Sequence, residues 1–350
     1  MVNIPKTMRG VWLLGHGDFD KLEVRTDIPT PRVRDNEVLI RVSAAGINNT
    51  DINTRIGWYS KNAGSDDASW AGEAIHFPRI QGIDVCGVIV DIGKNVNPSR
   101  IGDKVLVEPC LKEAAGKTLE SPWFLGSECD GGFAEFVAVV SRHAHKIASP
   151  LSVTDLASFP CSYSTAENML TKARVKAGEV VLVTGASGGV GSAALQLIKS
   201  RGAEAIVVTS PAKVDGLIKL GARKAITRAE SLISTLGENT VDVVVDLVGG
   251  DTWPELLQIL KPGGRYAVAG AIGGPIVSLD LRTLYLKDLS LFGCTVLEDS
   301  VFPNLISQIE NGRIKPLVSQ IFPLEDIIEA QKVFLQKKHT GKIVLSVAVE

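Results

Sequence analysis

Three evenly spaced glycines are the residues of this chain whose type and spacing best suit the binding of a ligand. Gly185, Gly188 and Gly191 follow a β-branched run and precede an apolar helical stripe. Glycine permits a tight turn at the first position, close approach of the backbone to a pyrophosphate at the second, and close helix packing at the third. The N–H groups and the dipole at the start of a helix then favour phosphate. The alternative is a glycine-rich turn that binds no ligand.

The elements on either side make this pattern more specific. Val180 to Thr184 is short, apolar and β-branched, which is typical of a strand buried in a parallel sheet. A second strand, Ala205 to Thr209, follows at the spacing of a β-α-β unit. The intervening helix, which ends at Gly202, is predicted from the spacing of Val190, Ala193, Ala194, Leu197 and Ile198. We therefore predict a dinucleotide site whose turn consists of Gly185, Ala186, Ser187, Gly188, Gly189, Val190 and Gly191.

The residues after the second strand predict which dinucleotide binds. An NAD site has Asp or Glu there, to bind the ribose 2′-hydroxyl. This chain has Thr209, Ser210 and Lys213 instead, so no carboxylate repels a 2′-phosphate. Two hydroxyls and an ammonium group can bind that phosphate, and each charge-assisted hydrogen bond is worth roughly 1.5–3 kcal/mol. The pattern favours NADP(H). The alternative for Lys213 is a solvated residue in the first turn of a helix.

The composition is typical of a well-buried α/β protein of two domains. The chain has 350 residues, of which 45% are hydrophobic and 34 are glycine, and its net charge is −2. This charge gives no electrostatic reason to expect nucleic acid or a membrane as a partner. The first ten residues contain charges and no apolar core, unlike a signal peptide. Five cysteines without CxxC spacing favour reduced thiols and a cytoplasmic location.

The chain has an all-β pattern up to about Ser149, which predicts a barrel or sandwich. Polar insertions interrupt it at Asp66 to Ala74 and at Lys112 to Ser127. The predicted strands are Arg9 to Leu13, Leu22 to Arg25, Glu37 to Ala44, Gly87 to Ile92, Lys104 to Glu108 and Phe133 to Val140.

A helix at Ser162 to Lys172 leads into a segment in which strand and helix patterns alternate, as in a doubly wound parallel sheet. Its further strands are Val241 to Leu247, Arg265 to Ala269 and Leu289 to Phe292. Helices are predicted at Thr252 to Leu260, Val301 to Glu310 and Leu324 to Leu335. The closing strand, Lys342 to Val349, is expected to rejoin the first domain.

Several motifs, taken in order, resemble the medium-chain dehydrogenase/reductase superfamily over nearly the whole chain. They are Gly102-Asp-Lys-Val105, Gly131-Gly-Phe-Ala-Glu-Phe136, the glycine turn and Gly341-Lys-Ile-Val-Leu345. The resemblance implies an α/β protein with a discontinuous GroES-like catalytic domain, residues 1–155 and 297–350, and a Rossmann domain, residues 156–296. It also implies a homodimer formed through the Rossmann edge strand, Leu289 to Cys294.

The zinc-dependent members of this superfamily hold their catalytic metal with two Cys and one His. This chain has Asn48 and Ile83 at two of the three matching positions and keeps only Cys161. One thiolate cannot make a tetrahedral site that needs three protein ligands, so no metal is expected. Without that Lewis acid, the hydride chemistry must differ from alcohol oxidation.

The run from Asn48 to Tyr59 resembles the active-site segment of the zinc-free branches, the quinone oxidoreductases and 2-enoyl thioester reductases. These enzymes add hydride to an activated C=C bond, and hydrogen-bond donors stabilise the charge on the carbonyl oxygen. By the match, Asn48 lines the nicotinamide pocket, Asp51 holds the loop and Tyr59 donates to the substrate carbonyl or protonates the α-carbon. Asn53 stands where some of these enzymes have Tyr. The alternatives are a turn cap for Asp51 and a pocket wall for Tyr59.

Further cofactor contacts are implied by the same resemblance. Asp246 and Gly270, after two predicted strands, would border the nicotinamide and its ribose. Ser164, beside Tyr163, could reach the cofactor, whereas Lys287 is interpreted as helix surface. The hypothesis is a cytoplasmic, zinc-independent NADPH-dependent reductase of quinones or α,β-unsaturated carbonyl compounds. Its alternatives are an alcohol dehydrogenase with atypical zinc ligands and a non-catalytic, crystallin-like NADPH-binding protein.

Overall fold

The computed structural model describes residues 4–60 and 74–347 and divides the chain into two compact units. Unit 1 comprises Met1–Cys161 and Pro316–Glu350, and unit 2 comprises Ser162–Lys315. The second boundary was predicted at 296/297, but helix α9 (Val301–Glu310) belongs to unit 2. A helical pattern does not reveal which body a helix packs on, which explains the difference. The predicted insertion from Asp66 lies, up to residue 73, outside the described residues.

Unit 1 is built on an antiparallel β-structure, as its alternating pattern predicted. Its largest sheet has the order β10-β6-β5-β3-β18-β17, with β9 also pairing with β3, and a smaller sheet has the order β2-β1-β4. The strands of the large sheet are β3 (Glu37–Ile47), β5 (Cys86–Ile92), β6 (Lys104–Val107), β9 (Phe136–Val140), β10 (Ala144–Lys146), β17 (Val318–Pro323) and β18 (Lys342–Ser346). Those of the small sheet are β1 (Thr7–Leu13), β2 (Leu22–Pro29) and β4 (Arg79–Ile80).

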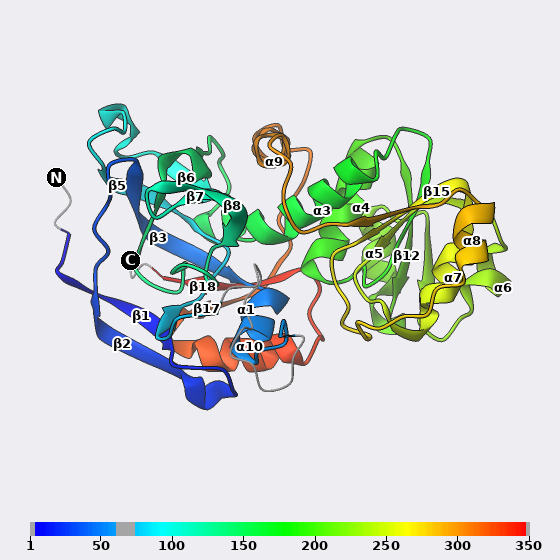
Figure 1. Ribbon diagram of the computed structural model, residues 1–350, viewed down its shortest axis with the longest axis horizontal. Coiled ribbons are helices and arrows are strands. Elements are labelled where there is room, and N and C mark those ends of the chain that lie inside the picture. Colours follow the sequence, from blue (N-terminus) through cyan, green and yellow to red (C-terminus); the bar gives the residue numbers. More distant parts are fainter. Residues whose placement is uncertain (1–3, 61–73, 348–350) are drawn as a thin grey trace. The chain divides into compact units, whose positions relative to one another are not determined.

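The closing strand β18 lies between strands from both ends of the chain. Ile343 and Ile47 are partners in its antiparallel pairing with β3, and β18 also pairs in parallel with β17. In Figure 1 the red β18 accordingly lies beside the blue β3. The start of β18 is therefore brought next to the end of β3, where the helix α1 (Asn49–Arg55) begins.

The predicted insertion from Lys112 to Ser127 is a β-hairpin. Strands β7 (Cys110–Ala114) and β8 (Lys117–Phe124) are joined by Ala115 and Gly116, both with positive φ, at 53° and 79°. Two successive residues with positive φ form the tight turn that suits the twist of paired strands. The usual sequence signal for this turn is Asn-Gly. This chain has Ala115-Gly116 instead, so the hairpin was not predicted from the sequence.

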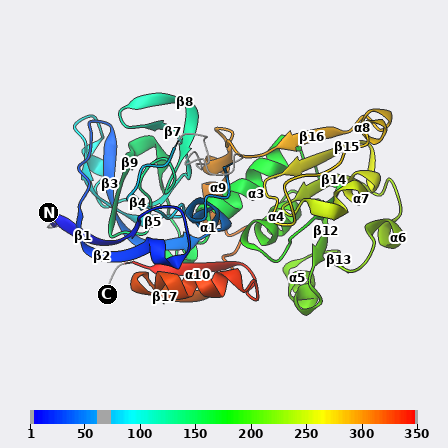
Figure 2. The same cartoon turned by 60° about the horizontal axis from the view of Figure 1, so that its bottom comes forward.

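Unit 2 is a doubly wound parallel sheet, as predicted. Its strand order is β13-β12-β11-β14-β15-β16, and Figure 2 shows the labelled strands following one another from β16 to β13. The strands are β11 (Val180–Val183), β12 (Glu204–Thr209), β13 (Lys224–Thr227), β14 (Val241–Asp246), β15 (Leu260–Val268) and β16 (Ser290–Gly293). The order reverses between β11 and β14, and ligands of such sheets bind at the carboxyl ends of the strands beside that reversal.

Helices cover this sheet, which is why its central strands are apolar on both faces. Helix α4 packs on β11 and β12, and a core cluster that includes Leu182, Val244 and Trp253 packs on the sheet with α7. The helices of unit 2 besides α9 are α3 (Pro160–Lys172, which begins at the end of unit 1), α4 (Gly189–Ser200), α5 (Val214–Leu220), α6 (Leu232–Leu236), α7 (Trp253–Gln258) and α8 (Leu281–Leu286). Unit 1 contains α1, α2 (Val153–Leu156) and α10 (Ile327–Leu335). None of the helices formed by the described residues is long and apolar enough to cross a bilayer.

Candidate functional site

The glycine turn of unit 2 has the geometry that its sequence predicted. Gly185 has a φ of +59°, a conformation that favours glycine. A side chain at Gly191 would place its Cβ 2.5 Å from the carbonyl oxygen of Gly185, so only glycine lets α4 pack this closely. A Cβ at Gly188 would meet nothing nearer than 3.6 Å, which leaves open space over the exposed backbone at the start of α4. This cradle fits a pyrophosphate group bound to backbone N–H groups.

The carboxylate of Asp246 fixes the loop that follows β14. It accepts hydrogen bonds from Thr184 Oγ1 and the Tyr266 hydroxyl, both at 2.5 Å, and from the backbone N–H groups of Val248 at 2.9 Å and Gly249 at 3.2 Å. Asp246 is fully buried, so these internal donors compensate its charge. Its carboxylate positions the loop, and a direct contact with a cofactor stays a prediction.

Gly270 lies where two loops of unit 2 approach each other. A Cβ there would come within 2.8 Å of the carbonyl oxygen of Leu247. Ser164, by contrast, is fully buried in α3. Lys287 donates from Nζ to the carbonyl oxygens of Leu257 at 2.9 Å and Gln258 at 2.8 Å, which caps the end of α7. Lys287, interpreted from the sequence as helix surface, is thus partly buried and bound to a neighbouring helix.

The end of β12 carries the residues predicted to choose the cofactor. Thr209 is fully buried, and its hydroxyl has no hydrogen-bond partner in the structure. Ser210 and Lys213 follow in a tight turn in which the Lys213 N–H donates to the Ser210 carbonyl oxygen at 3.0 Å. Burial lowers the pKa of Lys213, and the nearby charge of Arg228 lowers it further. The structure thus brings a hydroxyl without a partner, that of Thr209, and two cations to the neighbouring ends of β12 and β13.

In unit 1, Asn48 and Asp51 form the start of α1. The Asn48 N–H donates to the Asp51 carboxylate at 2.8 Å, three residues further on, as in a capping box. Asp51 therefore caps the helix, which was one of the two roles considered for it. Burial is the largest effect on Asp51 and raises its pKa to about 7. The Asp84 carboxylate also raises this pKa, whereas the Asn48 N–H and the Lys342 ammonium group lower it.

The end of α1 sets the position of Tyr59. The N–H of Trp58 donates to the Asn53 carbonyl oxygen at 2.9 Å, and that of Gly57 donates to the Thr54 carbonyl oxygen at 3.3 Å. With Gly57 at a φ of +71°, this is a Schellman motif that ends the helix and reverses the chain.

The reversal brings the Tyr59 hydroxyl within 3.2 Å of Thr50 Oγ1, to which it donates, and beside the side chain of Asn53. Burial raises the pKa of the Tyr59 phenol above its ordinary value. The phenol is therefore protonated at neutral pH and is able to donate. Asn53, which stands where some relatives have Tyr, is one of its neighbours.

A buried ion pair, Lys342 and Asp84, contacts Asn48 at the start of α1. Lys342 Nζ is 2.8 Å from Asp84 Oδ2 and also donates to the Asn48 side-chain oxygen. Asn48 Nδ2 donates to the same Asp84 oxygen at 2.8 Å, and the Cys161 N–H donates to Asp84 Oδ1 at 2.6 Å. Asp84 is fully buried and Lys342 is 2% exposed. Both the oxygen and the nitrogen of the Asn48 side-chain amide are therefore hydrogen-bonded within this network.

The positions that hold zinc in zinc-dependent relatives therefore do not fit a metal ion. Asn48 is bound to the ion pair, Ile83 has no donor atom, and the Lys342 ammonium group would repel a cation. Of these three positions, only Cys161 supplies a typical zinc ligand, and a catalytic site needs three protein ligands. Among residues 4–60 and 74–347, no group of three or more His, Cys, Asp or Glu side chains is placed to hold a metal.

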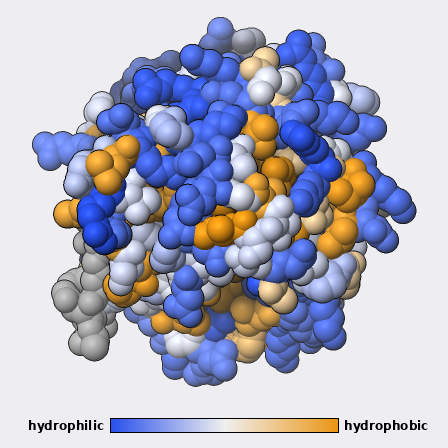
Figure 3. All heavy atoms as spheres, turned by 90° about the vertical axis from the view of Figure 1, so that its right-hand side faces the viewer, coloured by the Kyte–Doolittle hydropathy of each residue, from blue (hydrophilic) through white to orange (hydrophobic). Residues whose placement is uncertain are grey.

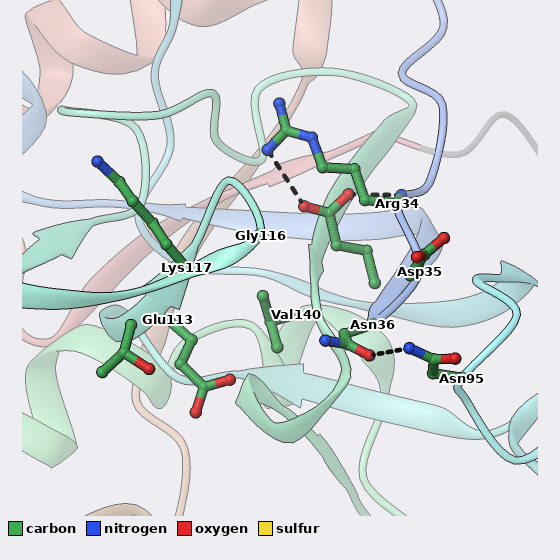
Figure 4. A pocket seen from close by; sticks show the side chains of 10 residues that line it. Arg34, Asp35, Asn36, Asn95, Glu113, Gly116, Lys117 and Val140 are labelled. Carbon is green, nitrogen blue, oxygen red and sulfur yellow. Dashed lines mark hydrogen bonds and ion pairs between the residues drawn. The ribbon is translucent and has the colours of Figure 1, made fainter.

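A separate polar cavity of about 530 Å³ opens in unit 1, away from these residues. Figure 4 shows its lining, in which Arg34 pairs with Glu37, and Asn95 donates to Asn36 at 2.9 Å. It contains none of the predicted site residues. Because these lining groups bind one another, the cavity offers no prepared site.

The contacts of Lys342 and Thr50 and the proximity of Arg228 to Lys213 were not predicted from the sequence. Lys342 begins an apolar strand, and a single Lys at a strand end gives no sign of a buried partner 258 positions away. Thr50 lies within the predicted active-site run, so its hydroxyl was a recognisable candidate. Arg228 follows the strand after Lys213, and only the strand register brings the two together.

Comparison with known proteins agrees with both units. Residues 34–149 match the family model of the alcohol dehydrogenase GroES-like domain, and residues 189–311 match that of the zinc-binding dehydrogenases. The quinone oxidoreductase of Homo sapiens is 28% identical, with 97% of this chain and 98% of that protein covered. The acryloyl-coenzyme A reductase of Sulfurisphaera tokodaii is 30% identical, with 97% and 99% covered.

A solved structure extends this similarity to the fold. A protein of Sinorhizobium meliloti 1021, provisionally assigned as an alcohol dehydrogenase, matches with a TM-score of 0.92 and 43% identity over 98% of this chain and 97% of that one. The chain therefore belongs to the medium-chain dehydrogenase/reductase superfamily. Proteins of this superfamily are oxidoreductases that bind nicotinamide cofactors. The predicted fold class, a GroES-like domain and a Rossmann domain, is confirmed.

Proposed function

We propose that this protein is a zinc-independent, NADPH-dependent reductase of quinones or of the activated C=C bond of α,β-unsaturated carbonyl compounds. The buried pair of Lys342 and Asp84, bound to Asn48, carries this proposal. Alcohol oxidation in this superfamily relies on a metal that lowers the pKa of the alcohol. A fixed ammonium group beside Asn48 leaves no room for that chemistry. Reduction of a conjugated carbonyl needs only hydrogen-bond donors for the charge on oxygen.

The residues of α1 and its C-terminal turn supply the polar part of this reaction. NADPH, when bound, supplies the hydride, which adds to the β-carbon of an enone or to a quinone. The Tyr59 phenol then donates to the carbonyl oxygen or gives its proton to the α-carbon, and water restores the phenol. Thr50 and Asn53 orient that hydroxyl, and Asp51 keeps α1 in place through its capping hydrogen bond.

The preference for NADPH over NADH rests on the end of β12. Thr209, Ser210 and Lys213 present hydroxyls and a cation at the position where an NAD site has a carboxylate. The glycine turn would hold the pyrophosphate through backbone N–H groups. The names of the relatives, a quinone oxidoreductase and an acryloyl-coenzyme A reductase, support the two substrate classes.

A screen of purified protein tests the proposal. NADPH oxidation is followed spectroscopically with a quinone, an enone, an enoyl thioester and an aldehyde, and bound metal is measured on the same preparation. Turnover of the quinone, enone or thioester by metal-free protein is the expected result. About one tightly bound zinc per chain together with aldehyde turnover would favour the alcohol dehydrogenase alternative. NADPH binding without turnover of any substrate would favour a non-catalytic protein.

We also propose that the protein is a cytoplasmic homodimer whose subunits meet along β16. This strand is the edge of the unit 2 sheet, and an edge strand presents N–H and C=O groups that can pair with another copy. The exposed apolar residues on and near α8 include Ile276, Leu281 and Leu286, which are 88%, 64% and 69% exposed. Figure 3 looks at the face on the side of α6 to α8, where apolar side chains gather in several groups among polar ones. A second copy would remove part of this surface from water.

A further inference from the structure

Two cations, Lys213 and Arg228, follow the ends of two adjacent strands of unit 2, β12 and β13. Thr209 is the last residue of β12, and its parallel partner in β13 is Thr227. The N–H of Arg228, the next residue, donates to the Thr209 carbonyl oxygen at 3.2 Å. The backbone of Arg228 therefore lies beside Thr209, and the turn that carries Lys213 directly follows Thr209 in the chain.

The two cations are close enough to interact. Like charges repel, and the Arg228 charge is close enough to Lys213 to lower the pKa of its ammonium group. The carboxylate nearest in sequence to Lys213 is that of Asp215, in the first turn of α5. The one nearest to Arg228 is that of Glu230, which accepts a hydrogen bond from the Thr227 N–H at 2.7 Å and so is engaged with the backbone of its own turn.

The hydroxyl of Thr209 is a second, independent sign of a missing ligand. Its side chain is fully buried, and Oγ1 has no hydrogen-bond partner. Buried polar atoms are nearly always hydrogen-bonded in folded proteins, so an exception at a strand end points to a group supplied from outside.

We propose that Arg228 is a specificity-determining residue that binds the 2′-phosphate of NADP(H) together with Thr209, Ser210 and Lys213. The assignment rests on the proposed preference for NADP(H). Arg suits this position because its planar guanidinium can make two parallel hydrogen bonds to phosphate oxygens, whereas Lys acts as a point charge. The phosphate would also neutralise the repulsion between the two cations.

The chain offers a matched control at the other end of the same strand. Arg223 directly precedes β13 and pairs with Glu204, so it lies at the amino end of the sheet, where no dinucleotide is expected. The variants Arg228→Ala, Arg228→Lys, Lys213→Glu and Arg223→Ala are therefore compared. Dissociation constants for 2′,5′-ADP and 5′-AMP, which differ only in the 2′-phosphate, are measured by calorimetry, and folding is checked by thermal unfolding.

Arg228→Ala should weaken 2′,5′-ADP binding about tenfold and leave 5′-AMP binding within about twofold. Arg228→Lys should lose less, Lys213→Glu should abolish the preference for 2′,5′-ADP, and Arg223→Ala should change neither constant. Full retention of the preference in Arg228→Ala would overturn the role of Arg228 alone. Equal binding of the two ligands to the unaltered protein would instead overturn the proposed preference for NADP(H).

Discussion

Lys342 Nζ lies 2.8 Å from Asp84 Oδ2, and the two charges are almost completely removed from water. Removing one partner of a buried ion pair leaves the other charge uncompensated. Lys342→Met should therefore lower the free energy of unfolding by about 3–5 kcal/mol, measured by urea denaturation. Adding Asp84→Asn should restore part of the loss, because it removes the stranded charge.

The exposed pair of Lys94 and Asp35 is the control for this prediction. Its side chains are 73% and 58% exposed. Lys94→Met should therefore change the free energy of unfolding by no more than about 1 kcal/mol. A Lys342→Met protein as stable as the unaltered one would contradict the role given to the buried pair.

The raised pKa of Asp51 predicts a pH dependence of stability. In the unfolded chain this carboxyl group ionises near its ordinary value, about 4. In the folded protein, burial raises its pKa to about 7, so the folded state binds more protons between these two values. Its contribution to stability is complete below about pH 4 and is lost as the pH rises through 7.

Asp51→Asn tests this contribution, because the amide oxygen can still accept from the Asn48 N–H. In the unaltered protein, the Asp51 carboxyl group should make the free energy of unfolding fall by about 1.4 kcal/mol per pH unit between pH 4 and 7. Asp51→Asn should abolish this fall in a series of urea denaturations at different pH values. Asp35→Asn, at an exposed carboxylate, should leave the slope unchanged. If the free energy of unfolding varies with pH equally in the unaltered protein and in Asp51→Asn, the Asp51 carboxyl group does not take up a proton in the folded protein.

Tyr59→Phe tests proton donation. Loss of a general acid should lower kcat about a hundredfold on whichever substrate the screen identifies. The free energy of unfolding should change by only about 1 kcal/mol, the worth of one hydrogen bond to Thr50. Tyr285→Phe, at a tyrosine 62% exposed on α8, should keep full activity. Unaltered turnover by Tyr59→Phe would leave this residue as a pocket wall.

Leu291→Lys tests the proposed dimer. Leu291 is 39% exposed in the middle of β16, and a charge there would be buried at the interface between two copies. We expect the unaltered protein to sediment as a dimer and this variant as a monomer. Ile218→Lys, at a comparably exposed residue of α5, should remain dimeric. A monomeric unaltered protein would refute the proposal.

The sequence predicted the fold well wherever local periodicity controls it. The strand before Gly185 and the close packing at Gly191 follow from residue type alone, because few side chains fit a buried parallel strand or a crowded turn. The cap role of Asp51, one of two roles considered for it from the sequence, depends on the same kind of local contact. Such features depend on neighbours within a few positions.

Features that depend on tertiary pairing were not predictable in this way. The partners of Lys342 lie 258 and 294 positions away. The proximity of Arg228 to Lys213 arises from the register of two strands, and the place of α9 in unit 2 arises from packing. In each case the residues carry no periodic pattern that specifies the partner.

The pairing of β18 with β3 also has a consequence for biosynthesis. Asp84 and Asn48 leave the ribosome long before Lys342, so the nascent first domain lacks both a strand of its main sheet and the cation for its buried carboxylate. The segment from Asn48 to Tyr59 therefore cannot reach its final form during early translation. Truncation before Lys342 should consequently disable the protein even though most of the chain has been made.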